Sequence, residues 1–143
     1  AKDLVQSLLA DGEFQSLSLA ERNAVTERIL SDVKGRMMED IVLLETKIAY
    51  PQKQVFQLQF AVGEFDMVVA DSSTATCEIY EVKHSKEQSP EQYRHLIDEE
   101  KLSATEFRYG KVTKRTVIYR GANATLANGI EYKNVEEYLK ELV

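Results

Sequence analysis

Apolar side chains recur every three or four residues in the N-terminal third of the chain, the spacing that builds one face of an α-helix. Ser18 and Glu21 form a capping box, so the pattern predicts a long helix that begins there and runs to about residue 49, before Pro51. Its apolar positions predict one continuous core-facing stripe, formed by Val25, Ile29, Val33, Met37, Ile41, Leu44 and Ile48. Gly35 marks a kink or a break into two helices.

A short helix over residues 2–10 precedes this element, and three strands follow it. The strands are predicted over residues 55–62, 64–71 and 76–85, which are rich in β-branched and aromatic side chains. Gly63 and the stretch that begins at Asp71 supply turns. Antiparallel pairing of neighbouring strands is therefore expected.

The second half of the chain adds helices and further strands. Ser89 and the proline after it predict a single helix over residues 90–110, and an apolar strand is expected at 114–121. Asn128-Gly129 is a hairpin-turn signal that leads into a short strand at 130–133, and a last helix follows Asn134. Helices that alternate with strands in this order predict an α/β fold, with a mixed central sheet flanked by helices.

Length and composition narrow the class of protein. The 143 residues suffice for one domain with a hydrophobic core. Cys77 is the single cysteine, which excludes an internal disulfide and argues against a cysteine-based zinc site. Because the sequence shows neither a membrane-spanning apolar run nor a signal peptide, we expect a cytoplasmic protein without membrane contact. The net charge of −6 argues against non-specific coating of DNA, although acids that bind a cation would contribute to the same sum.

Three charged residues stand out within the predicted strands. Glu81 and Lys83 lie two residues apart and therefore share one strand face, and antiparallel pairing brings Asp66 near Glu81. Two neighbouring carboxylates repel each other unless a divalent cation lies between them, and oxygen ligands suit Mg²⁺ or Mn²⁺. The alternative is an ordinary ion pair at the rim of a sheet.

Asp66 followed by Glu81-Val82-Lys83 resembles the D…ExK pattern of the PD-(D/E)xK nuclease superfamily. The resemblance implies a restriction-endonuclease-like fold and Mg²⁺-dependent hydrolysis of phosphodiester bonds in a nucleic acid. It implies that Asp66 and Glu81 are metal ligands and that Lys83 is the catalytic amine. It also implies a further acid from the preceding helix, for which Glu39 is the first choice and Glu45 the second. Glu39 lies on a secondary stripe of that helix with Gly35, Val42 and Thr46, so we expect it to face the sheet.

A closer resemblance rests on three segments. Residues 35–39 (GRMME), 64–68 (EFDMV) and 79–83 (IYEVK) are similar to the C-terminal domain of a family of bacterial and archaeal AAA-type ATPases. It implies a nuclease-like domain over residues 33–143 and a helical connector over residues 1–32, as part of a larger ATPase chain or assembly. The sequence lacks the phosphate-binding loop motif G-x-x-x-x-G-K-[ST], and it also lacks the tryptophan that is usual in the family.

Two other functions remain open at this point. The same fold could serve as an interaction or regulatory module of an ATPase without any chemistry, which suits the acidic composition. An unrelated small α/β ligand-binding domain is the third alternative. Oligomeric state and the nucleic acid, DNA or RNA, are not indicated by the sequence.

Overall fold

A computed structural model describes residues 16–143 of the chain. By its internal contacts the chain divides into two compact units between Met37 and Met38, a boundary that lies inside helix α3 (Leu19–Ala49). The helix expected over residues 2–10 lies outside the described residues. No helix in the described range combines the length and apolarity needed to cross a bilayer.

Helix α3 begins with the capping box expected from the sequence. The amide of Ser18 donates to the Glu21 carboxylate at 3.3 Å, and the amide of Glu21 donates to Ser18 Oγ at 3.2 Å. The backbone stays helical through Gly35, so of the two alternatives at this residue, a kink or a break, the break into two helices does not occur. A single Gly lowers helix stability by about 1 kcal/mol, which a 31-residue helix tolerates.

The sheet contains six strands in the order β1-β2-β3-β4-β6-β5. The pairs β1–β2, β2–β3 and β5–β6 are antiparallel, whereas β3–β4 and β4–β6 are parallel. The fold is therefore α/β with a mixed sheet, as expected. The strands are β1 (Gln54–Gln59), β2 (Glu64–Asp71), β3 (Thr76–Val82), β4 (Lys111–Tyr119), β5 (Ala124–Thr125) and β6 (Glu131–Asn134). β1 and β3 each end three residues earlier than predicted.

The connection from β3 to β4 corrects the single helix predicted over residues 90–110. It contains a 3₁₀ turn, η1 (Pro90–Tyr93), and a separate helix, α4 (Glu99–Tyr109). Asp98 starts α4, because its carboxylate accepts hydrogen bonds from the amides of Glu100 and Lys101. The chain turns between the two elements so that Leu96 enters the core, fully buried.

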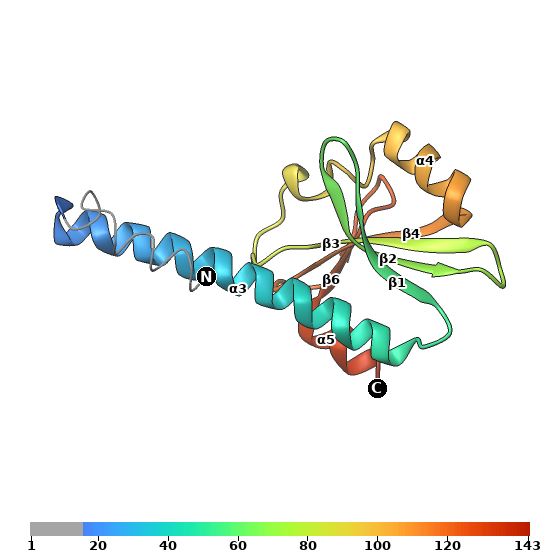
Figure 1. Cartoon of the computed structure of the whole chain (residues 1–143), viewed down its shortest axis with the longest axis horizontal. Helices are drawn as coiled ribbons and strands as arrows, with labels where there is room; N and C mark the ends of the chain where they lie inside the picture. The colour runs from blue at the N-terminus through green and yellow to red at the C-terminus, as the bar shows by residue number, and fades with distance from the viewer. Residues whose placement is uncertain (1–15) are drawn as a thin grey trace. The chain divides into compact units, whose positions relative to one another are not determined.

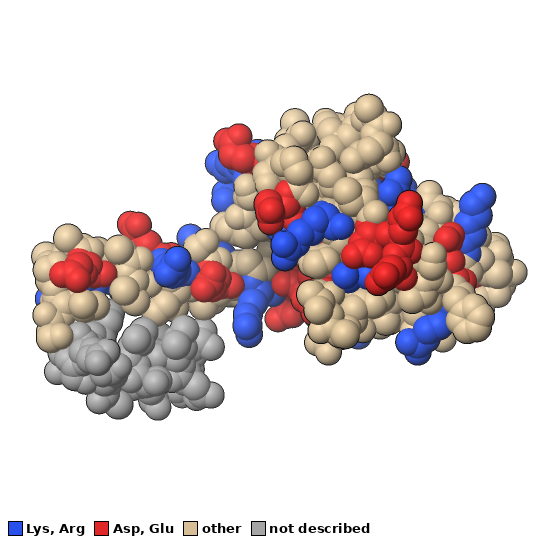
Figure 2. Space-filling model, turned by 90° about the horizontal axis from the view of Figure 1, so that it is seen from above, with Lys and Arg blue, Asp and Glu red and all other residues tan. Residues whose placement is uncertain are grey.

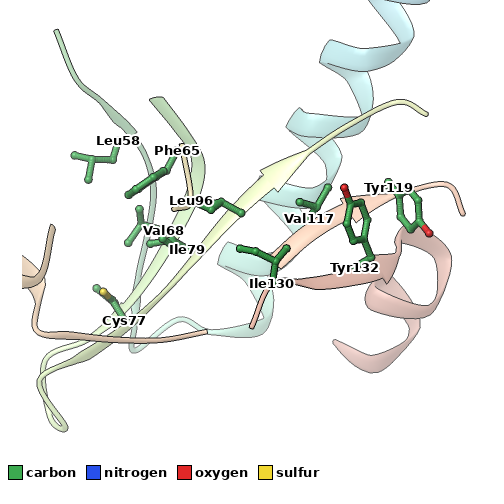
Figure 3. Packing of buried hydrophobic residues seen from close by; sticks show 11 residues of the cluster. Leu58, Phe65, Val68, Cys77, Ile79, Leu96, Val117, Tyr119, Ile130 and Tyr132 are labelled. Atoms are coloured by element: carbon green, nitrogen blue, oxygen red, sulfur yellow. The ribbon is translucent and has the colours of Figure 1, made fainter. Parts of the chain in front are cut away.

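Within residues 38–143, helices cover both faces of the sheet (Figure 1). The last turns of α3 and helix α5 (Val135–Glu141) pack on one face, where Val42 and Tyr138 belong to the same buried cluster. η1 and α4 lie over the other face, whose buried cluster includes Phe65, Ile79 and Leu96. Figure 3 shows side chains of this second cluster arranged along neighbouring strands, with Leu96 reaching in from the crossover.

The prediction that the apolar stripe forms the core face of α3 is wrong for the C-terminal half of the helix. Val42 and Thr46 are the buried residues of α3, and Met38 and Leu43 pack beside them. The predicted core residues Met37, Ile41, Leu44 and Ile48 are exposed. The sheet contacts the side of the helix that carries Val42 and Thr46, the secondary stripe on which Glu39 was expected to face the sheet.

Candidate functional site

Asp66 and Glu81 lie side by side on neighbouring strands, where the sequence placed them. The β2–β3 register pairs Met67 with Tyr80, so Asp66 faces Glu81 one rung further along. Both side chains are buried, with 7% and 2% of their surface exposed. Asp66 Oδ2 accepts a hydrogen bond from the amide of Val82 at 2.8 Å, which fixes the carboxylate across the two strands.

A β-bulge in β2 places Asp66 in this position. Phe56 of β1 pairs with Val68 and Leu58 pairs with Phe65, so two β2 residues stand opposite one residue of β1. Phe65 and Val68 consequently belong to the same core cluster although they are three residues apart. The bulge lets β2 keep its apolar contacts and still direct an acid towards β3.

Two further carboxylates join Asp66. Oxygens of Glu39, Glu64 and Asp66 all lie within 4.8 Å of one another. Glu39 comes from the sheet-facing side of α3 and Glu64 from the first position of β2, directly after the turn at Gly63. The sequence proposed Glu39 but did not assign a role to Glu64, although Glu64 is part of the 64–68 segment that carried the resemblance.

Crowding and burial favour the protonated form of these acids. Burial, followed by the neighbouring charge of Asp66, raises the pKa of Glu39 to about 7 and that of Glu81 to about 9. The same two causes raise the pKa of Glu64. The site therefore holds several carboxyl groups that are difficult to ionise together.

Lys83 is the cation nearest to the buried acid of β3. Its Nζ lies 3.4 Å from Glu81 Oε2, and its side chain is 38% exposed, so the amine stands between the buried carboxylate and solvent. The amide of Lys83 donates to the carbonyl of Ile118, which holds the residue against β4. Glu81 Oε1 is buried without a hydrogen-bond partner, one of two such side-chain atoms among the described residues.

These groups open into a pocket of about 450 Å³. Glu64, Asp66, Glu81 and Lys83 line it, together with Gln59, Phe60, Gly63 and His95. The imidazole of His95 packs so closely over Gly63 that a methyl group on this glycine would collide with the ring. Burial, then the charges of Lys101 and Arg94, lower the pKa of His95, so the ring is neutral at pH 7.

His95 is a pocket residue that the sequence did not identify. It belongs to the segment between η1 and α4 that was expected to be helical, and its contact with Gly63 joins positions 32 residues apart. No local sequence signal marks such a contact. Glu45, the second choice for the helix acid, is exposed on α3, away from the sheet-facing side that carries Glu39.

The arrangement brings together Glu39, Asp66, Glu81 and Lys83, the four residues named from the sequence, and adds Glu64 and His95. Comparisons of the chain with protein families, with curated proteins and with solved structures find no match.

Proposed function

We propose that the domain is a Mg²⁺- or Mn²⁺-dependent phosphodiesterase of the PD-(D/E)xK type, acting on a nucleic acid. The observation that carries the proposal is the convergence of Asp66 and Glu81 from adjacent strands, with Lys83 beside Glu81 and Glu39 beside Asp66. An ordinary rim ion pair would involve one acid and one exposed lysine, and would not gather further carboxylates around it.

The donor groups fit a divalent cation. All are carboxylate oxygens, the ligands that Mg²⁺ and Mn²⁺ prefer, and three come within 4.8 Å of one another. Glu81 contributes a buried oxygen without a partner, which is costly in a folded protein unless something binds it. The raised pKa values of Glu39 and Glu81 share two causes, burial and the neighbouring charge of Asp66, and a bound cation would offset both. Glu39, Glu64 and Asp66, whose oxygens are these three, would hold the ion, and Glu81 beside Asp66 would be a further ligand.

A bound Mg²⁺ or Mn²⁺ would lower the pKa of a coordinated water and offset negative charge on a phosphodiester. The chain's own groups would position and stabilise the reactants. The Lys83 ammonium, half-exposed at the pocket, would orient the attacking water or neutralise charge that develops on the phosphate oxygens. The hydrogen bond from the Val82 amide orients the Asp66 carboxylate next to the other acids, which would favour binding of the ion.

The order of elements supports the restriction-endonuclease-like fold. Helix α3, the antiparallel strands β1–β3, the crossover with α4 and the parallel strand β4 follow the α-β-β-β-α-β core of that superfamily. On the closer resemblance we further propose that the domain works with an AAA-type ATPase, in the same chain or assembly, in the cytoplasm.

A binding module with the same fold and no chemistry is the second candidate, favoured by the charge of the molecule. The net charge is −6, and the pocket contains three carboxylates against one lysine. On the face drawn in Figure 2, lysine and arginine side chains stand in small groups between acids, without a continuous basic band. A phosphate backbone binds most strongly to a basic surface.

A cleavage assay distinguishes the two candidates. The chain is incubated with supercoiled DNA, single-stranded DNA and RNA, with Mn²⁺ or Mg²⁺, beside Glu81→Ala, Lys83→Ala and Glu39→Gln. We expect cleavage by the wild type and a loss of at least about 100-fold in the Glu81 and Lys83 variants, because the first removes a proposed metal ligand and the second the amine that would act on the reacting groups.

Glu45→Gln and Lys86→Ala are the matched controls. Both residues are exposed. Glu45 lies on the same helix as Glu39, and Lys86 lies three residues after Lys83. Cleavage that persists in Glu81→Ala would come from a contaminant or another site. A wild type that neither cuts any of the three substrates nor gains thermal stability with Mn²⁺ would favour the binding module.

A further inference from the structure

Helix α3 carries a row of large apolar side chains that nothing in the described chain covers. Met37, Ile41, Leu44 and Ile48 are 56%, 47%, 57% and 65% exposed. At about 100° per residue they lie on the side of α3 opposite Val42 and Thr46, the two residues buried against the sheet unit. The face defined by these four side chains is called the outer face of α3.

The spacing of the outer face is that of a helix–helix seam. The intervals between the four residues are four, three and four, the a/d pattern of a two-helix coiled coil. Single exposed apolar residues are common on protein surfaces, whereas a contiguous row of four is typical of a contact surface.

We propose that the outer face binds a second copy of this chain, with the two α3 helices antiparallel about a two-fold axis. In this arrangement Ile41 of each copy packs against Leu44 of the other, and Met37 packs against Ile48. This contact is independent of the proposed function, because the outer face lies outside the candidate site.

Charges beside the outer face favour the antiparallel direction. Asp40 and Lys47 are both exposed and lie seven residues apart, so they border the same side of the row. Antiparallel packing brings Asp40 next to Lys47 of the second copy, and the two-fold axis repeats the pair. Among the described residues neither side chain takes part in an ion pair within its own chain.

The parallel arrangement lacks this complementarity. Glu45 borders the other side of the row and is exposed. In a parallel pair of helices Asp40 would meet Glu45 of the second copy, and the like charges would repel each other. A second copy in the antiparallel direction is therefore the partner that the side chains of α3 fit best.

The candidate site remains accessible in such a dimer. Glu39 lies on the sheet-facing side of α3, about 160° around the helix from Ile41. The outer face and the pocket thus use opposite sides of one helix. Two pockets would be held in a fixed two-fold relation.

The first test measures the mass of the complete chain by sedimentation equilibrium from about 5 to 500 μM. We expect a monomer–dimer equilibrium for the wild type, and a monomer at every concentration for Ile41→Glu/Leu44→Glu. Both residues are exposed in the single chain, so circular dichroism and melting at low concentration should not change. Phe107→Glu is the matched control, because Phe107 is 92% exposed on α4, and it should dimerise like the wild type.

Charge reversal tests the direction. Asp40→Lys and Lys47→Asp should each raise the dissociation constant about tenfold, because two attractive pairs become repulsive, and the double variant should restore it. A wild type that stays monomeric, or a dimer that survives Ile41→Glu/Leu44→Glu, would overturn the proposal. Tighter dimerisation of Asp40→Lys would show a parallel pair, and no effect of either reversal would also refute the antiparallel contact.

Discussion

At the residue scale, the central feature is the burial of Glu81. Its carboxyl group lies between Asp66 and Lys83, and one of its oxygens has no hydrogen bond. Asp66, in contrast, is equally buried but bonded to the Val82 amide. The two acids therefore share a site but differ in how well the protein alone satisfies them, and Glu81 depends most on a partner that the chain does not supply.

The pKa of Glu81 predicts how stability depends on pH in the metal-free protein. Burial and Asp66 raise this pKa to about 9 in the folded state, above the ordinary value of 4.5 in the unfolded chain. Between these values the folded state binds more protons, so the free energy of unfolding falls as pH rises from about 5 to 9. Glu81→Gln removes this contribution, and we expect it to be more stable than the wild type by about 1–3 kcal/mol at pH 8.5, with little difference at pH 5.

Urea unfolding at several pH values, in EDTA, measures this effect. Glu78→Gln on the same strand is the control, because Glu78 is only partly buried and should leave the pH dependence unchanged. A wild-type stability that is flat or rises between pH 5 and 8.5 would contradict the account of Glu81.

At the element scale, the crossover between β3 and β4 shows how a cap decides where a helix begins. Ser89 has the sequence signature of a helix start, yet only the four-residue turn η1 follows it. Gln92 closes that turn by accepting from the Ser89 amide and from the Tyr132 hydroxyl. The longer helix α4 begins only after Asp98. The residues between η1 and α4 place Leu96 in the core and His95 at the pocket.

Asp98→Ala should destabilise the protein by about 1 kcal/mol, since it removes the oxygen that caps two amides of α4. Chemical unfolding gives the value. Glu99→Ala changes an exposed acid in the same turn that does not cap the helix, and it should cost less than about 0.5 kcal/mol. Equal effects of the two substitutions would mean that Asp98 is not the effective start of α4.

At the scale of the whole molecule, the acidic site adds to a net negative charge. A chain with net charge −6 gathers the carboxyl groups of Glu39, Glu64, Asp66 and Glu81 at one site, and the pKa values of Glu39, Glu64 and Glu81 are raised. Such an arrangement is unfavourable for the protein alone. A bound divalent cation would convert it into a stabilising contact.

We therefore expect Mn²⁺ to raise the melting temperature, by several degrees at 100 times the dissociation constant, where binding stabilises the fold by about 2.7 kcal/mol. The rise should be larger at pH 8 than at pH 6, because protons on Glu39 and Glu81 compete with the metal. Differential scanning calorimetry records the shift. Glu81→Ala should abolish it and Glu45→Gln should retain it, whereas an equal shift in both variants would show non-specific screening of charge.

The sequence by itself determined most elements and the central pair of acids. These features follow from local patterns: the strand segments, the turns at Gly63 and Asn128-Gly129, and the two-residue spacing of Glu81 and Lys83. They identified a mixed α/β sheet with Asp66 beside Glu81, because antiparallel strands joined by a short turn have few possible registers.

The tertiary structure alone decided which surfaces meet. It packed the secondary stripe of α3, with Val42 and Thr46, against the sheet and left Ile41 and Leu44 of the main apolar stripe in solvent. It also brought His95 onto Gly63 and Glu64 next to Glu39. These contacts join residues far apart in the chain, and their energies depend on the packing of the whole core rather than on spacing within one element.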